Sequence, residues 1–200
     1  MKTFALLIFQ LFLLARLTAA QQSENIKYFD TKNRPITEKK FKERRATNQV
    51  LDIVGDSTNH RKLIEREENG QFADYAKLVS AIEKASGKKI DTEKPLVIIY
   101  YPGKDKCNET ISLSKSTSYY RSLQKQSDAH LIFVYKDFDS STGNIPDKWI
   151  KDPEALVEKS FFKYHYPCQS FVAISKTGKY SSYFGEFPLS FVEKAVKAVQ

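Results

Sequence analysis

Two unbroken apolar runs of strand length constrain the fold of this 200-residue chain most strongly. They are LVIIYY, residues 96–101, and HLIFVY, residues 130–135. A strand with one face in water alternates apolar and polar residues, whereas a strand in a parallel sheet is apolar throughout because both of its faces are covered. We therefore expect two buried parallel strands, connected by a helix that includes Tyr119, Tyr120 and Leu123.

Helical and strand patterns around these runs predict an α/β architecture. Residues 74–86 place apolar side chains on one helical face, and a glycine follows at the position typical of a helix end. Asp152-Pro153 predicts a helix start, because aspartate is a good cap and proline fits the first turn. Residues 171–184 predict two strands joined by a Lys176-Thr177-Gly178 turn, and a last helix starts at Leu189.

The polar segment before this domain is predicted to be an extension, residues 21–72, which contains a short helix and a β-hairpin. The run TEKKFKERRAT, residues 37–47, favours the helix, and its basic cluster Lys39–Arg45 is either a solvated face or a site for an anionic surface or glycan. Residues 50–54 and 62–67 predict the two strands of the hairpin.

The first twenty residues have the pattern of a cleavable signal peptide. A lysine near the start precedes an apolar stretch, residues 4–14, and the small residues TAA, 18–20, follow. Gln10 and Arg16 interrupt the segment, so its apolar run is shorter than the roughly twenty residues that cross a bilayer. We expect cleavage before Gln21 and an exported protein, either periplasmic or extracellular.

Charge and composition narrow the choice of partners. The formal net charge is +8; the leader contributes Lys2 and Arg16 and no acids, which leaves 8 − 2 = +6 on the mature chain. Acids stand beside most of the lysines, so we expect no nucleic acid as partner. No later segment is apolar enough to span a membrane, and an unknown protein partner remains possible.

We expect no cofactor and no metal, since His60, His130 and His165 lack the spacing of metal ligands.

Residues 73–200 resemble the thioredoxin-like superfamily. The matching features are the strand LVIIYYP, the cysteine-bearing loop after it, the strand at 130–135, and the unit FVAISKTGKYSSYFGEF, residues 171–187, followed by a helix. Gly178, Lys179 and Gly185 occupy the places of the family's turn glycine and lysine and of the glycine at the strand end. The resemblance implies a thioredoxin-like three-layer α/β/α sheet.

The chain departs from the family at the catalytic motif. Family oxidoreductases carry Cys-Xaa-Xaa-Cys where the helix after the buried strand begins, because the helix N-terminus activates the first thiol and the second thiol resolves the mixed disulfide. Here that place reads Lys104-Asp105-Lys106-Cys107, with one cysteine at the resolving position, or at the nucleophile's position if the loop is longer. The family's cis-proline position falls near Ser170, whereas the nearby proline is Pro167. We do not expect dithiol exchange by the family route.

The resemblance also implies that the loops of Cys107 and Cys168 face each other. We favour a structural disulfide between them, since paired thiols oxidise outside the cytosol, and a binding or structural role for the protein. The first alternative is an atypical thiol-disulfide oxidoreductase in which Cys107 attacks and Cys168 resolves. The second is two unpaired thiols, or one that binds a partner covalently.

Two residues beside the cysteines have alternative interpretations. His165 stands three residues before Cys168 and either raises its thiolate fraction or is a loop residue without a role. Asn108-Glu109-Thr110 is a glycosylation sequon, which matters in a eukaryotic host.

Overall fold

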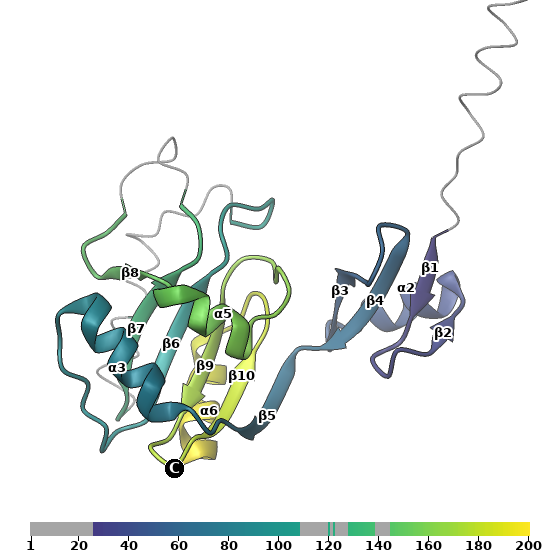
Figure 1. Cartoon of the computed structure of the whole chain (residues 1–200). Helices are drawn as coiled ribbons and strands as arrows, with labels where there is room; N and C mark the ends of the chain where they lie inside the picture. Colours follow the sequence, from purple (N-terminus) through teal and green to yellow (C-terminus); the bar gives the residue numbers. More distant parts are fainter. Residues whose placement is uncertain (1–25, 109–119, 121, 123–127, 139–144) are drawn as a thin grey trace, which may run out of the picture.

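The protein has an α/β structure, and its described residues form two β-sheets (Figure 1). The computed structural model describes residues 26–108, 120, 122, 128–138 and 145–200. The signal peptide predicted at residues 1–20 and most of the helix predicted around residues 119–123 lie outside the described residues. Within the described part of the chain, no helix is long and apolar enough to cross a membrane.

The larger sheet has six strands and contains both apolar runs. Its order is β5-β10-β9-β6-β7-β8, with bounds β5 Glu67–Gln71, β10 Lys179–Tyr183, β9 Ser170–Ile174, β6 Leu96–Tyr101, β7 His130–Tyr135 and β8 Trp149–Lys151. β6, β7 and β8 are parallel, as predicted for the first two of them. β9 runs antiparallel to β6, and β10 runs antiparallel to both β9 and β5.

Helices cover both faces of this sheet, so the domain has three layers. α3 (Tyr75–Ser86) and α5 (Leu156–Phe161) pack on one face, and α6 (Leu189–Val199) packs on the other (Figure 1). Since side chains alternate along a strand, β6 contributes to both cores. Val97 and Ile99 join the core under α6, whereas Ile98 and Tyr100 join the core under α3 and α5. This explains why the run has no polar position.

The smaller sheet belongs to the N-terminal part of the chain. Its order is β2-β1-β4-β3, with bounds β1 Lys27–Phe29, β2 Pro35–Ile36, β3 Val50–Val54 and β4 His60–Glu65. The predicted hairpin is present as β3 and β4, paired antiparallel. The predicted short helix is α2 (Glu38–Arg45), and the Thr37 hydroxyl caps it by accepting from the Lys40 N–H. Phe41, Val50 and Leu63 form the core between helix and sheet.

The strand β5 was not expected. The sequence EENGQ has no apolar residue, and all five residues are exposed, because β5 lies at the sheet edge with β10 as its only neighbour in the sheet. The sequence places residues 67–71 in the N-terminal extension, yet they pair with β10 of the last hairpin. The large sheet therefore begins before residue 73.

The helix predicted to start at Asp152-Pro153 starts later, at Leu156. Pro153–Ala155 forms a 3₁₀ turn in which Glu154 and Ala155 have positive φ angles of 56° and 54°. The N-cap residue of α5 is Ala155 and not Asp152. The Asp152 carboxylate nevertheless supports the first turn of the helix, because it accepts from the Val157 N–H at 2.9 Å and from the Glu158 N–H at 2.8 Å.

Candidate functional site around Cys107 and Cys168

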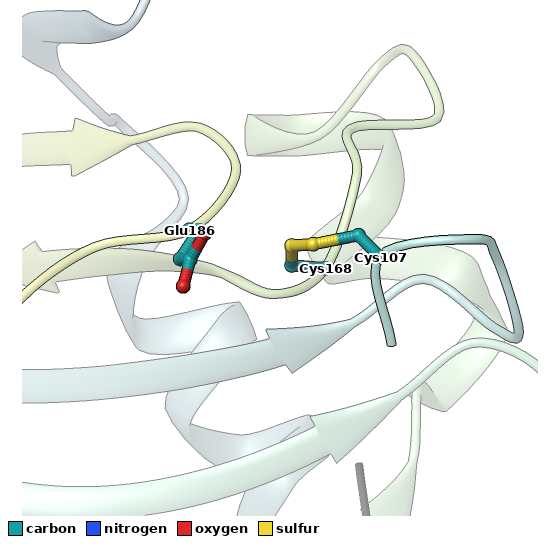
Figure 2. Close-up of side chains that lie close together, drawn as sticks. All are labelled: Cys107, Cys168 and Glu186. Atoms are coloured by element: carbon teal, nitrogen blue, oxygen red, sulfur yellow. A yellow bond between two sulfur atoms is a disulfide. The ribbon is translucent and has the colours of Figure 1, made fainter. Parts of the chain in front are cut away.

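Cys107 and Cys168 form a disulfide, as predicted (Figure 2). β6 ends at Tyr101, and its loop carries Cys107; β9 starts at Ser170, two residues after Cys168. The two strands are antiparallel neighbours, with Tyr100 opposite Ser170, so the end of one and the start of the other meet at the same edge of the sheet. The two Cα atoms lie 5.1 Å apart, within the usual range for a disulfide.

The carboxylate of Asp105 ties the backbones of both cysteines together. Its Oδ1 accepts from the Cys107 N–H at 2.8 Å and from the Asn108 N–H at 2.9 Å. Its Oδ2 accepts from the Cys168 N–H at 2.9 Å. Hydrogen bonds to a charged acceptor are stronger than neutral ones. One side chain thus fixes both loops independently of the sulfur–sulfur bond.

Asn108 forms a second link between the loops. Its Oδ1 accepts from the Asp105 N–H at 2.8 Å, and its amide group donates to the Gly103 carbonyl at 2.8 Å and to the Cys168 carbonyl at 3.2 Å. The side chain is buried, with 2% of the residue exposed. Since its amide nitrogen is buried and hydrogen-bonded, the folded protein does not offer Asn108 as a glycan acceptor, and this side chain instead links the two loops.

The two cysteines differ in exposure. Cys107 is exposed, whereas Cys168 is 4% exposed and has a positive φ of 67°. A reagent from solvent therefore reaches the Cys107 side of the bond first. The peptide bond before Pro167 is trans, and no cis peptide occurs in the described residues. The cis-proline that the thioredoxin-like resemblance would place near Ser170 is thus absent from this loop.

His165 lies beside Asp105. Its Nε2 is 3.3 Å from Asp105 Oδ2, the oxygen that also accepts from the Cys168 N–H. The structure therefore gives His165 a contact with the carboxylate that holds Cys168. His60 and His130 lie elsewhere, on β4 and β7, and burial lowers the pKa of His130.

Glu186 completes the site from a third loop, between β10 and α6 (Figure 2). A carboxylate oxygen of Glu186 and the sulfurs of Cys107 and Cys168 all lie within 4.8 Å of one another. Sequence reasoning missed this residue, because nothing in the sequence marks which side chain of this loop faces the cysteines. The glycine at the strand end, Gly185, was the sequence signal that could have located this loop.

No protein-family model and no curated protein matches this chain. The site must therefore be interpreted from its own geometry.

Part of the basic cluster Lys39–Arg45 lies beside neighbouring acids. Lys42 pairs with Glu38 at 2.6 Å on the helix, and Arg45 lies 3.8 Å from Asp52. Arg44 lies 4.0 Å from the buried Asp30. Both aspartates make a closer ion pair with another arginine, Asp30 with Arg34 at 2.8 Å and Asp52 with Arg61 at 2.7 Å. These contacts leave both interpretations of the cluster, a solvated face and an anion site, in place.

Proposed function

We propose that this is an exported thioredoxin-like protein with a binding or structural role, in which the Cys107–Cys168 disulfide stabilises the fold. The observation that carries the proposal is the Asp105 carboxylate, which accepts from the backbone N–H groups of both cysteines. The resulting network holds the loops side by side whether or not the sulfurs are bonded. Two thiols that are held this close together oxidise readily to a disulfide. The resulting bond has the low reduction potential that is typical of structural disulfides.

The charges around the sulfurs also favour a structural bond. Asp105 and Glu186 bring two carboxylates to the cysteines. Catalytic thiols are activated by cations or by a helix N-terminus, whereas nearby anions disfavour the thiolate. The Cys-Xaa-Xaa-Cys arrangement that would activate a nucleophile is missing, since Lys104 stands at its first position.

The large sheet supports the thioredoxin-like assignment. The sheet contains the pieces on which the resemblance rests, since β6 and β7 are parallel neighbours and β9 and β10 form an antiparallel hairpin. α6 follows the last hairpin, and Cys107 follows the central strand β6. The turn glycine, Gly178, has a φ of +85°, a conformation that other residues rarely adopt.

Export rests on the signal-peptide pattern of residues 1–20 and is supported by the disulfide. Disulfides persist in oxidising compartments and are rare in the cytosol.

The alternative function is an atypical thiol-disulfide oxidoreductase that uses Cys107 and Cys168. The observation in its favour is the difference in exposure, since an exposed Cys107 could attack a substrate disulfide and a buried Cys168 could resolve the product. Lys104 and Lys106 are exposed on the same loop and would favour a thiolate.

Redox measurements separate the two functions. For a structural bond, the native protein has no titratable thiol in a glutathione buffer of cytosolic poise, and two thiols appear only after denaturation. In an insulin-reduction assay with dithiothreitol, the wild type and Cys107→Ser should then give the same rate. If the wild type accelerates the reduction and Cys107→Ser abolishes the acceleration, the structural role is refuted and the oxidoreductase is supported.

A further inference from the structure

The site brings together three groups that are metal ligands once the disulfide is open. Both cysteine sulfurs and a carboxylate oxygen of Glu186 lie within 4.8 Å of one another, and the three residues come from three different loops (Figure 2). Thiolate and carboxylate are both established ligands of Zn²⁺. The grouping was invisible in the sequence, because Glu186 is distant from Cys107 along the chain.

The loop that carries Glu186 is held in place by its backbone. The Gly185 N–H donates at 3.1 Å to the hydroxyl of Ser170, the first residue of β9. Arg66 donates through Nη1 to the carbonyls of Phe184 and Glu186, each at 3.4 Å. The Phe184 N–H in turn donates to the Arg66 carbonyl at 2.8 Å. Glu186 is therefore presented to the cysteines by a fixed segment.

Hydrogen bonds connect the two cysteine loops in addition to the disulfide. The Cys168 N–H is bonded to Asp105, and the Cys168 carbonyl accepts from the Asn108 amide group. In a tetrahedral zinc site with Zn–S bonds of about 2.3 Å, the two sulfurs lie about 3.8 Å apart. Side-chain rotation achieves this separation while the Cα atoms remain 5.1 Å apart.

We infer that the reduced protein binds a divalent, thiophilic ion such as Zn²⁺ through Cys107, Cys168 and Glu186. Each thiol releases one proton to solvent and donates a sulfur lone pair to the ion, and Glu186 donates a carboxylate oxygen. Water occupies the fourth position. Metal binding itself transfers no electron, whereas the oxidised protein must first take up two electrons and two protons from a thiol reductant, which opens the disulfide to two thiols. The reduced form exists in every newly made chain before its disulfide forms.

The local charge favours this ion over free thiolates. Asp105 and Glu186 disfavour further negative charge at the sulfurs, and the exposed Lys104 and Lys106 on the same loop offset part of this effect. A dication neutralises the site more fully, because it binds the two thiolates directly. The disulfide form lacks this capacity, because its sulfurs carry no negative charge and are poor ligands. Metal binding and disulfide formation therefore exclude each other, and a bound ion delays oxidation of the chain.

The test is a metal titration of the whole protein in its two redox states. Zn²⁺ is titrated against a chromophoric chelator, with a non-chelating phosphine as reductant, and Co²⁺ is used as a spectroscopic probe. We expect one equivalent bound by the reduced protein, with a near-ultraviolet thiolate-to-cobalt charge-transfer band, and none bound by the disulfide form. Equal binding by the two states, or no binding by the reduced state, would overturn the inference.

Two variants test the ligands separately. Glu186→Gln keeps both cysteines and is expected to weaken Zn²⁺ binding at least about tenfold, since even outer-shell substitutions commonly cost that much. Glu193→Gln, on the neighbouring helix α6, is the matched control and should bind as the wild type does. Cys107→Ser should remove the cobalt charge-transfer band of a two-thiolate site. An unchanged affinity in Glu186→Gln would refute the three-ligand site, whatever the folding of the cysteine variant.

Discussion

Removal of the disulfide by the double substitution Cys107→Ser and Cys168→Ser should strongly destabilise the protein. The bond joins residues that are 61 positions apart. It acts mainly on the unfolded chain, because the folded loops remain connected through Asp105 and Asn108. The loss of stability therefore reflects the entropy that the unfolded chain regains.

The chain-entropy treatment gives the size of the effect. A closed loop of this length corresponds to roughly 4 kcal/mol at 25 °C. Total unfolding free energies of single domains are about 5–15 kcal/mol, so the bond would supply a large share of the stability. With a urea m-value of about 2 kcal/mol per molar, the unfolding midpoint should fall by about 2 M.

Trp149 provides the signal for this measurement. It is the only tryptophan of the chain, it is 5% exposed on β8, and its ring packs against the ring of Phe133 at 5.1 Å. Urea unfolding is followed by its fluorescence in the oxidised wild type, the reduced wild type and the double variant. The two forms without the bond should coincide with each other and lie well below the oxidised protein.

One result would refute this reasoning. If the oxidised protein and the double variant unfold at the same urea concentration, the disulfide does not stabilise the fold, and the structural role proposed for it fails. A changed m-value would instead show that the bond compacts the unfolded chain.

Three further predictions concern residues around the site and the two sheets. Asp105→Ala removes the acceptor of three backbone N–H groups and should lower the free energy of unfolding by about 3 kcal/mol, measured by the same urea titration. Gly178→Ala should lower the melting temperature by calorimetry, with a loss of more than about 1 kcal/mol, because φ is +85° and a Cβ would collide with a backbone carbonyl; Gly87→Ala, also at positive φ but in open space, should cost less. The Arg34 backbone N–H, followed by its side chain, lowers the pKa of Asp30 from 3.8 to about 2, so the stabilisation by this carboxylate is complete above about pH 4 and is lost as the pH falls through 2. Asp30→Asn should flatten the decline of unfolding free energy with acid over that range, and an unchanged slope would contradict the assignment.

The parts of the fold that sequence predicts best are those with a strong apolar pattern. β6 is apolar at every position because it contributes to two cores, and this pattern identified it as a buried strand. The hairpin of β3 and β4 also follows from alternation and turn residues. β5 could not be found in this way, since an exposed edge strand owes its conformation to the hydrogen bonds of β10 and not to burial.

The sequence predicted the disulfide of the site, but it did not predict the polar side chains around the disulfide. Cys107 and Cys168 could be paired because the resemblance brings their loops together. Asp105 looked like one of many acids between lysines, and only the folded loop reveals that its oxygens accept from both cysteines. Glu186 could be recognised only once the loop between β10 and α6 was seen to lie beside the cysteines. Polar side chains that act through tertiary contacts leave no periodic signal in a sequence.

The exposed edge strand β5 also affects how the chain behaves when it is shortened. Without residues 67–71, β10 would become the sheet edge. Its sequence is KYSSY, in which Lys179 is charged and the other four residues are not. Uncharged open edges pair readily with other chains, whereas charged ones resist. β5 places the carboxylates of Glu67 and Glu68 at the edge of the sheet. We therefore expect β5 to oppose self-association of the folded domain through this edge.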